Sequence, residues 1–109
     1  MTATTQAASH HDREVAELRE NRELAVEYLR VAMAALDSPG DRGAGLLALR
    51  TVAEAYGGLA QVAAEAGISR ESLYRALSPK GNPTLKTLLA VLKTVGMRLS
   101  VEPEHPAAA

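Results

Sequence analysis

The sequence predicts an all-α domain of five helices followed by a short β-strand. Apolar residues make up 47% of the 109 residues, yet Phe and Trp are absent, so the core must be built from Ala, Leu and Val. Such a composition favours helices. Apolar residues also recur three and four positions apart in stretches that Gly and Pro separate, which is typical of amphipathic helices. The length suits one compact domain.

The first two predicted helices lie in the N-terminal half of the chain. The first begins near Arg22, ends before Asp37, and has an apolar face of Ala25, Tyr28, Leu29, Ala32, Met33 and Leu36. The second follows Asp41, a residue type that caps helix N-termini, and stops at the Gly57–Gly58 pair. Upstream of both, Val15 and Leu18 leave open a short additional helix.

Three shorter helices are predicted to follow. The third runs from Leu59 to Glu65, Gly67 bends the chain, and Ser69 caps a fourth helix that ends near Ser78. A loop then leads to Thr84, which caps a fifth helix with an apolar stripe of Leu85, Leu88, Leu89, Leu92 and Val95. Gly96 ends that helix.

The remaining segments set the predicted domain boundaries. Residues 1–12 are rich in Thr, Ala, Ser and His without an apolar period, so we expect a disordered N-terminal arm. The domain spans residues 13–101 and ends in Met97–Val101, where apolar residues alternate as in a β-strand. A lone strand needs a partner, which a second subunit or another protein would supply. Residues 102–109 are expected to form a frayed tail.

The net charge of −1 conceals an asymmetry along the chain. Up to Tyr56 nine acidic residues stand against six arginines, a net charge of −3. From Gly57 to Ser100 two acids stand against six bases, a net charge of +4. A basic segment in an otherwise acidic chain indicates one face that meets a polyanion and another that meets a different partner.

Several classes of function find no support in the sequence. With no Cys and with His10, His11 and His105 outside the predicted core, we expect neither a metal site nor a cofactor. No signal peptide or membrane-spanning run is evident, so we expect a cytoplasmic protein without membrane contact. The chain also lacks a Gly-rich phosphate loop and paired carboxylates in an apolar setting, which speaks against an enzyme.

The bend at Gly67 is what a helix-turn-helix requires. The first helix of that motif needs a small residue where the second helix crosses it, and the turn needs a residue that tolerates a positive φ angle. Ala63 and Gly67 meet these needs. The apolar positions expected to be buried are Val62, Ala66, Ile68, Leu73 and Leu77.

The side chains left exposed are candidate DNA contacts. On the second helix of the motif they would face the major groove, where an arginine can donate two hydrogen bonds to one guanine. The loop and the next helix would reach phosphates. The candidates are Ser69, Arg70, Glu71, Tyr74, Arg75, Ser78, Lys80, Asn82 and Lys86. A plain packing unit with solvated surface charges is the alternative interpretation.

From about Asn21 to Val101 the chain resembles the addiction-module antidote proteins, which are antitoxins with a lambda-repressor-like helix-turn-helix. The resemblance rests on "EYLRVAMAAL", on "ALRTVAEAYGGLAQVAAEAG", and above all on "GISRESLYRALSPKGNPTLKTLL" from Gly67 to Leu89. This last block joins recognition helix, Gly-Asn-Pro loop and following helix in the family's order.

The resemblance implies an antitoxin of a type II toxin-antitoxin module. Such a protein binds a small toxin of the RelE/ParE superfamily and represses their shared operon by binding operator DNA, and we expect it to do so as a homodimer. The alternatives are a stand-alone phage-type or housekeeping repressor and a protein-interaction module that has lost DNA binding.

Overall fold

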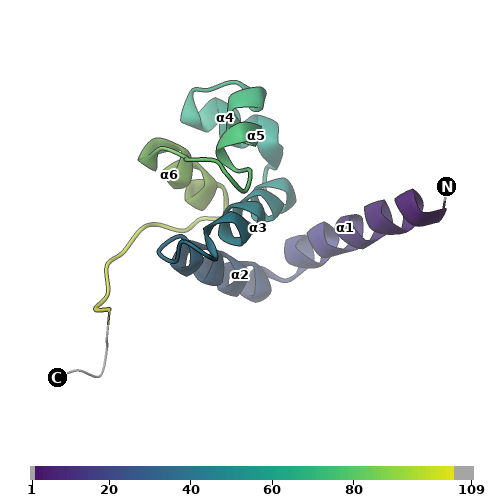
Figure 1. The fold of residues 1–109 in the computed structure, drawn as a ribbon, viewed down its shortest axis with the longest axis horizontal. Coiled ribbons are helices and arrows are strands. Elements are labelled where there is room, and N and C mark those ends of the chain that lie inside the picture. The colour runs from purple at the N-terminus through teal and green to yellow at the C-terminus, as the bar shows by residue number, and fades with distance from the viewer. Residues whose placement is uncertain (1, 105–109) are drawn as a thin grey trace.

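The computed structural model of the chain describes residues 2–104, and the regular secondary structure within them consists of six helices. The all-α class is confirmed, whereas the predicted number of five helices is wrong. The helices are α1 (Thr2–Glu20), α2 (Arg22–Ala35), α3 (Arg42–Ala55), α4 (Gly58–Ala66), α5 (Arg70–Ala76) and α6 (Leu85–Thr94). Figure 1 shows α2 to α6 gathered into one body, from which α1 projects along the longest, 56 Å dimension of the molecule.

Side-chain caps account for where three of these helices begin. The side-chain oxygens of Asn21, Ser69 and Thr84 accept hydrogen bonds from backbone N–H groups in the first turns of α2, α5 and α6. Each such bond satisfies a donor that the helix itself leaves free. Asp41 stands at the predicted position before α3, but its side chain makes no capping bond.

The N-terminal region differs from the disordered arm predicted for residues 1–12. Helix α1 begins at Thr2 and continues to Glu20, so Val15 and Leu18 belong to a long helix, not to a short one. The Ala residues early in the chain have high helix propensity, and helix propagates readily from a turn that is already fixed. The helix was not predicted because residues 1–12 lack the apolar periodicity by which amphipathic helices are recognised.

Four polar contacts and one buried side chain fix the second half of α1 to the body. Leu18 is buried, and its carbonyl accepts a hydrogen bond of 2.8 Å from the Tyr56 hydroxyl. The Arg19 Nε donates to the carbonyl of Ala55 at 3.1 Å. His11 Nε2 and Glu54 Oε2 lie 3.1 Å apart. These contacts join α1 to the C-terminal end of α3.

The fourth contact ties α1 to α2. The Tyr28 hydroxyl donates a 2.8 Å hydrogen bond to Glu14 Oε2. Burial of the phenol, together with this hydrogen bond and the charge of the Glu14 carboxylate, raises the pKa of Tyr28 to about 12. The neutral, donating form of Tyr28 is therefore favoured at any ordinary pH.

The C-terminal strand predicted at Met97–Val101 is a second correction. No strand occurs in residues 2–104, and residues 97–104 have no regular secondary structure. Only Met97 packs partly against the core, while Val101 is 98% exposed. The period-2 pattern was a poor guide because a strand also needs a neighbouring strand for its backbone hydrogen bonds, and residues 2–104 provide none. The frayed tail predicted for 102–109 lies outside the described residues from 105 onward.

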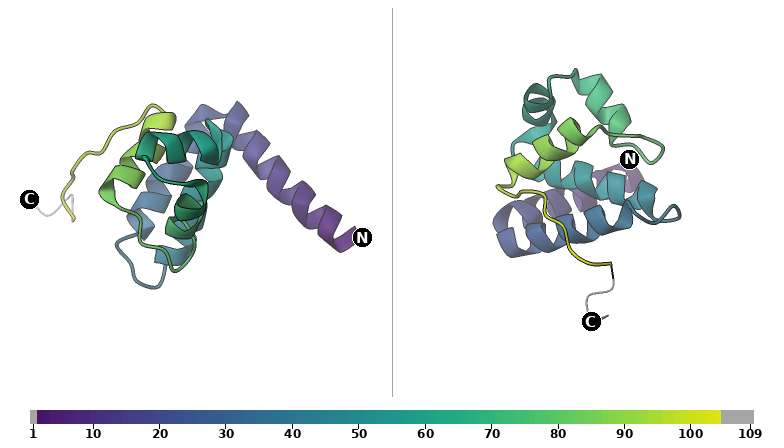
Figure 2. Two further views of the ribbon diagram at one scale, coloured as in Figure 1. Left: turned by 90° about the horizontal axis from the view of Figure 1, so that it is seen from above. Right: turned by 90° about the vertical axis from the view of Figure 1, so that its left-hand side faces the viewer.

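Helix α3 is the centre of the fold. Its buried residues include Leu46, Leu49 and Val52, which are fully inaccessible, and α1, α2, α4 and α6 all pack against it. Figure 2 shows α3 between α2 on one side and the group of α4, α5 and α6 on the other. The packing of α3 therefore sets the position of α2 relative to the group of α4, α5 and α6.

Candidate nucleic-acid interface

The junction of α4 and α5 is a tight three-residue turn closed by Gly67. Gly67 has a φ angle of +71°, and its N–H donates to the carbonyl of Ala64. The N–H of Ile68 donates to the carbonyl of Ala63 at 3.0 Å. This pair of bonds is the Schellman arrangement, which requires a left-handed residue and satisfies the last carbonyls of the helix. The predicted bend and its glycine are thus present.

Helix α5 presents a polar face to solvent and an apolar face to the core. Leu73 and Leu77 are fully buried and anchor the helix. All five candidates at or on this helix are exposed, namely Ser69, Arg70, Glu71, Tyr74 and Arg75. Ser69 is already engaged, since its hydroxyl oxygen accepts from the backbone N–H of Ser72 at 3.0 Å. The capping of α5 is by itself a sufficient reason for a serine at position 69, and no contact with DNA is needed to explain it.

The loop after α5 is folded back against the end of that helix. The hydroxyl of Ser78 donates to the carbonyl of Arg75 at 2.7 Å, and the N–H of Gly81 donates to the carbonyl of Ser78 at 2.8 Å. A Cβ atom on Gly81 would overlap the backbone carbonyl of Ala76, so only glycine fits there. The loop therefore holds the exposed side chains of Lys80 and Asn82 beside the C-terminal end of α5.

Lys86, on α6, lies close to the bend at Gly67. Its Nζ is 3.3 Å from the position that a Cβ atom on Gly67 would occupy. An ammonium group there is close to the C-terminal end of α4, where the helix dipole attracts cations. Lys86 is exposed and remains able to meet a phosphate, but stabilisation of the bend alone also explains its place.

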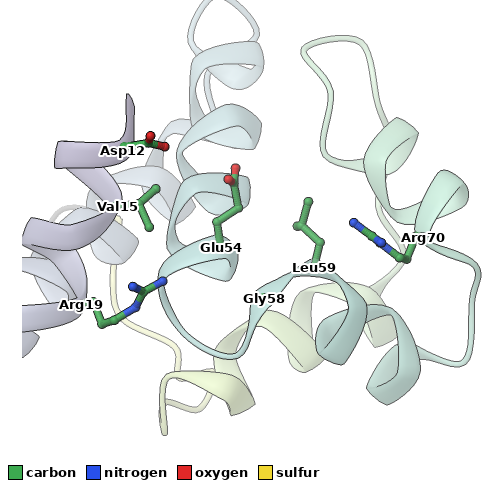
Figure 3. A pocket seen from close by; sticks show the side chains of 7 residues that line it. All are labelled: Asp12, Val15, Arg19, Glu54, Gly58, Leu59 and Arg70. Atoms are coloured by element: carbon green, nitrogen blue, oxygen red, sulfur yellow. The ribbon is translucent and has the colours of Figure 1, made fainter. Parts of the chain in front are cut away.

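Arg70 stands apart from the other basic side chains. It lines a cleft of about 420 Å³ between α1, the end of α3 and the start of α4. Figure 3 shows its guanidinium directed towards Leu59, across the cleft from the carboxylates of Asp12 and Glu54. The remaining lining residues are Val15, Arg19 and Gly58. Arg70 thus belongs to the flank of the α5 face beside α1, whereas Arg75 does not line this cleft.

One contact of this face was not predicted from the sequence. The guanidinium carbon of Arg50, on α3, lies 4.4 Å from the centroid of the Tyr74 ring. This is a cation–π arrangement between side chains 24 positions apart in the sequence. The only available signal was that Arg50 is a basic residue in the acidic half, which by itself says nothing about α5.

A second hollow lies on another side of α3, along its contact with α2. It is an apolar groove of about 650 Å³, and its only charged lining residues are Glu27 and Asp41. Val31 projects from it with 59% of its surface exposed. The other lining residues are Leu24, Tyr28, Ala32, Ala34, Ala35, Ser38, Ala44, Gly45 and Ala48. None of the candidate DNA contacts lines this groove.

Two further kinds of feature are absent from the part of the chain that the structure describes. No group of three or more His, Asp or Glu side chains within residues 2–104 is arranged to hold a metal ion. In the same part of the chain no helix combines the length and the apolar character needed to cross a lipid bilayer.

Comparison with known families decides the relationship that this geometry leaves open. The profile of the family described as "Probable addiction module antidote protein" matches residues 9–103, which is most of the chain. The chain belongs to this family. The match covers α2 to α6 and all nine candidate residues.

Comparison with an individual relative adds less. An uncharacterized protein of Haemophilus influenzae is 46% identical to it over 57 residues, which are 52% of this chain and 58% of the relative. The chain thus matches little more than half the length of that relative. No solved structure gives a significant match. The lambda-repressor-like character of the fold therefore stays a prediction.

The bend at Gly67 can be tested by its stability. In this chain, Gly67→Ala forces a left-handed conformation on an L side chain and should lower the free energy of unfolding by about 1–2 kcal/mol. Gly40→Ala is the matched control, because Gly40 has no positive φ angle and nothing lies within 4 Å of an added Cβ. Urea denaturation measures both variants. Equal stabilities of the two would contradict the role given to the bend.

Proposed function

We propose that this chain is the antitoxin of a type II toxin-antitoxin module, which neutralises a RelE/ParE-type toxin and represses its own operon as a DNA-bound homodimer in the cytoplasm. Membership of the antidote family implies a toxin partner in general terms. The type of toxin, the DNA binding and the dimer are the proposed part.

The observation that carries the DNA-binding proposal is the exposed polar face of α5. Glu71, Tyr74 and Arg75 project from a helix that two buried leucines hold firmly against the core. Lys80 and Asn82 lie on the adjoining loop, which Gly81 allows to pass close to the end of α5. A short exposed helix flanked by basic residues has the form in which major-groove readers present side chains to bases and phosphates.

The proposed chemistry divides the face into two kinds of contact. Arg75, and Arg70 if it turns out of its cleft, would donate paired hydrogen bonds to a guanine. Glu71 would accept from a cytosine amino group or orient a neighbouring arginine. Ser69, Tyr74, Ser78, Lys80, Asn82 and Lys86 would meet the sugar-phosphate backbone and fix the register of α5.

The toxin contacts are proposed for the acidic half of the chain. This half bears a net charge of −3 up to Tyr56, which suits a basic partner. The groove between α2 and α3 supports the proposal, since it is apolar, its charged lining residues are both acidic, and none of the candidate DNA contacts lines it. A toxin bound there would leave α5 free for DNA.

The two kinds of DNA contact respond differently to substitution. Arg75→Ala should cost roughly 1–3 kcal/mol on the operator and relax the preference at one base position. Lys80→Ala should weaken binding to operator and random duplexes alike and reduce the salt slope by about 1. Fluorescence anisotropy across a salt series separates them. If both variants lost equal affinity on specific and random DNA, the proposed base readout would be wrong.

Neutralisation can be tested with a small reading frame next to this gene, where sequencing of the flanking DNA reveals one. Its product, expressed alone, should arrest growth, and co-expression of this chain should restore it. Val31→Glu places a charge in the α2–α3 groove at an exposed position and should abolish the rescue. Leu89→Glu, at an exposed leucine of α6 outside the groove, is the control and should preserve it. If the product of that reading frame does not arrest growth, the alternative of a stand-alone repressor is favoured.

A further inference from the structure

The contact between Arg50 and Tyr74 places an arginine of α3 beside the α5 face. Tyr74 is half-exposed and lies among the candidate DNA contacts, and the Arg50 guanidinium covers one side of its ring at 4.4 Å. A second contact shows that the same side of α3 adjoins the following loop. A Cβ atom on Gly43 would lie 3.1 Å from the carbonyl oxygen of Pro79.

Gly43 and Arg50 are seven residues apart on α3, which is two helical turns, so they share one side of that helix. That side therefore runs along both α5 and the loop that carries Lys80. This side of α3 therefore adjoins the surface proposed to meet DNA, and Arg50 on it is partly exposed.

The charge of Arg50 has no carboxylate partner among the described residues. Glu54, four positions later on α3, is spaced to pair with Arg50, but its carboxylate is instead 3.1 Å from His11 on α1. No ion pair within residues 2–104 includes Arg50. The aromatic ring orients the guanidinium without neutralising it, since a stacked arginine keeps its N–H donors free at the edge of the plane.

We propose that Arg50 is a contact to a phosphate of duplex DNA, supplied by α3 and positioned by the ring of Tyr74. The proposal rests on the DNA binding proposed above and extends the interface from α5, the loop and α6 to a fourth element. Stacking on Tyr74 restricts the rotamers of Arg50 before DNA arrives, which lowers the entropy lost on binding.

The test uses the full chain, with the DNA upstream of its gene and a random duplex of equal length as probes. Arg50→Ala should weaken binding to both duplexes by roughly five- to tenfold and lower the salt slope by about 0.9. Arg50→Lys keeps the charge and should retain the slope. Arg30→Ala is the control, because Arg30 is an exposed arginine of α2 paired with Glu27 and should leave binding unchanged.

A double-mutant cycle tests the positioning by Tyr74. In a Tyr74→Ala background, the loss caused by Arg50→Ala should be smaller than in the native chain, because the unstacked arginine already binds less well. Thermal melts of each variant establish that it folds.

The outcomes separate this proposal from the one on which it rests. If the native chain binds upstream DNA and Arg75→Ala weakens it, but Arg50→Ala alters neither affinity nor salt slope, Arg50 is only a packing residue and this inference is wrong. If the native chain binds neither duplex at any salt concentration, both proposals fail.

Discussion

The burial of α3 is the constraint on which the rest of the molecule depends. Leu46, Leu49 and Val52 are completely inaccessible, and four other helices pack against the helix that carries them. Loss of one such leucine to alanine typically costs 2–5 kcal/mol, a large part of the stability of a domain of this size. Because α3 touches α2 on one side and α4 and α6 on another, its packing sets the relation between the groove and the α5 face.

The α5 face depends on this centre through two further restraints. The left-handed conformation of Gly67 sets the angle at which the chain leaves α4, and Leu73 and Leu77 hold α5 in the core. Because Leu73 and Leu77 point into the core, the side chains between them on the opposite side of the helix, such as Tyr74 and Arg75, face solvent. A seven-residue helix is too short to be stable alone, so its exposed surface exists only because the fold imposes it.

Much of this arrangement could be predicted from residue spacing and turn chemistry. Asn21 was not foreseen as a cap, but Ser69 and Thr84 cap the helices they were expected to cap, and Gly67 bends the chain as expected. These features are local, since each depends on a few neighbouring residues. The site residues on α5 and the loop were predicted to be exposed for the same reason, and nearly all of them are.

The failures concern features that depend on distant parts of the chain. Helix α1 is held by Tyr28, Ala55 and Tyr56, none of which can be inferred from the polar composition of residues 1–12. The prediction of a strand at 97–101 was wrong because an alternation of apolar and polar residues describes the side chains but does not supply a second strand to pair with. The contact of Arg50 with Tyr74 and the cleft around Arg70 arise from helix packing, which spacing along one helix does not report.

A footprint of the full chain on the DNA upstream of its own gene tests the central claim most directly. A single α5 can read only a few base pairs, so specific binding by this chain requires two copies of α5 on one duplex. The account predicts a protected region with two half-sites related by a two-fold axis and separated by about one helical turn. A single asymmetric half-site, or no protection at low salt, would contradict it.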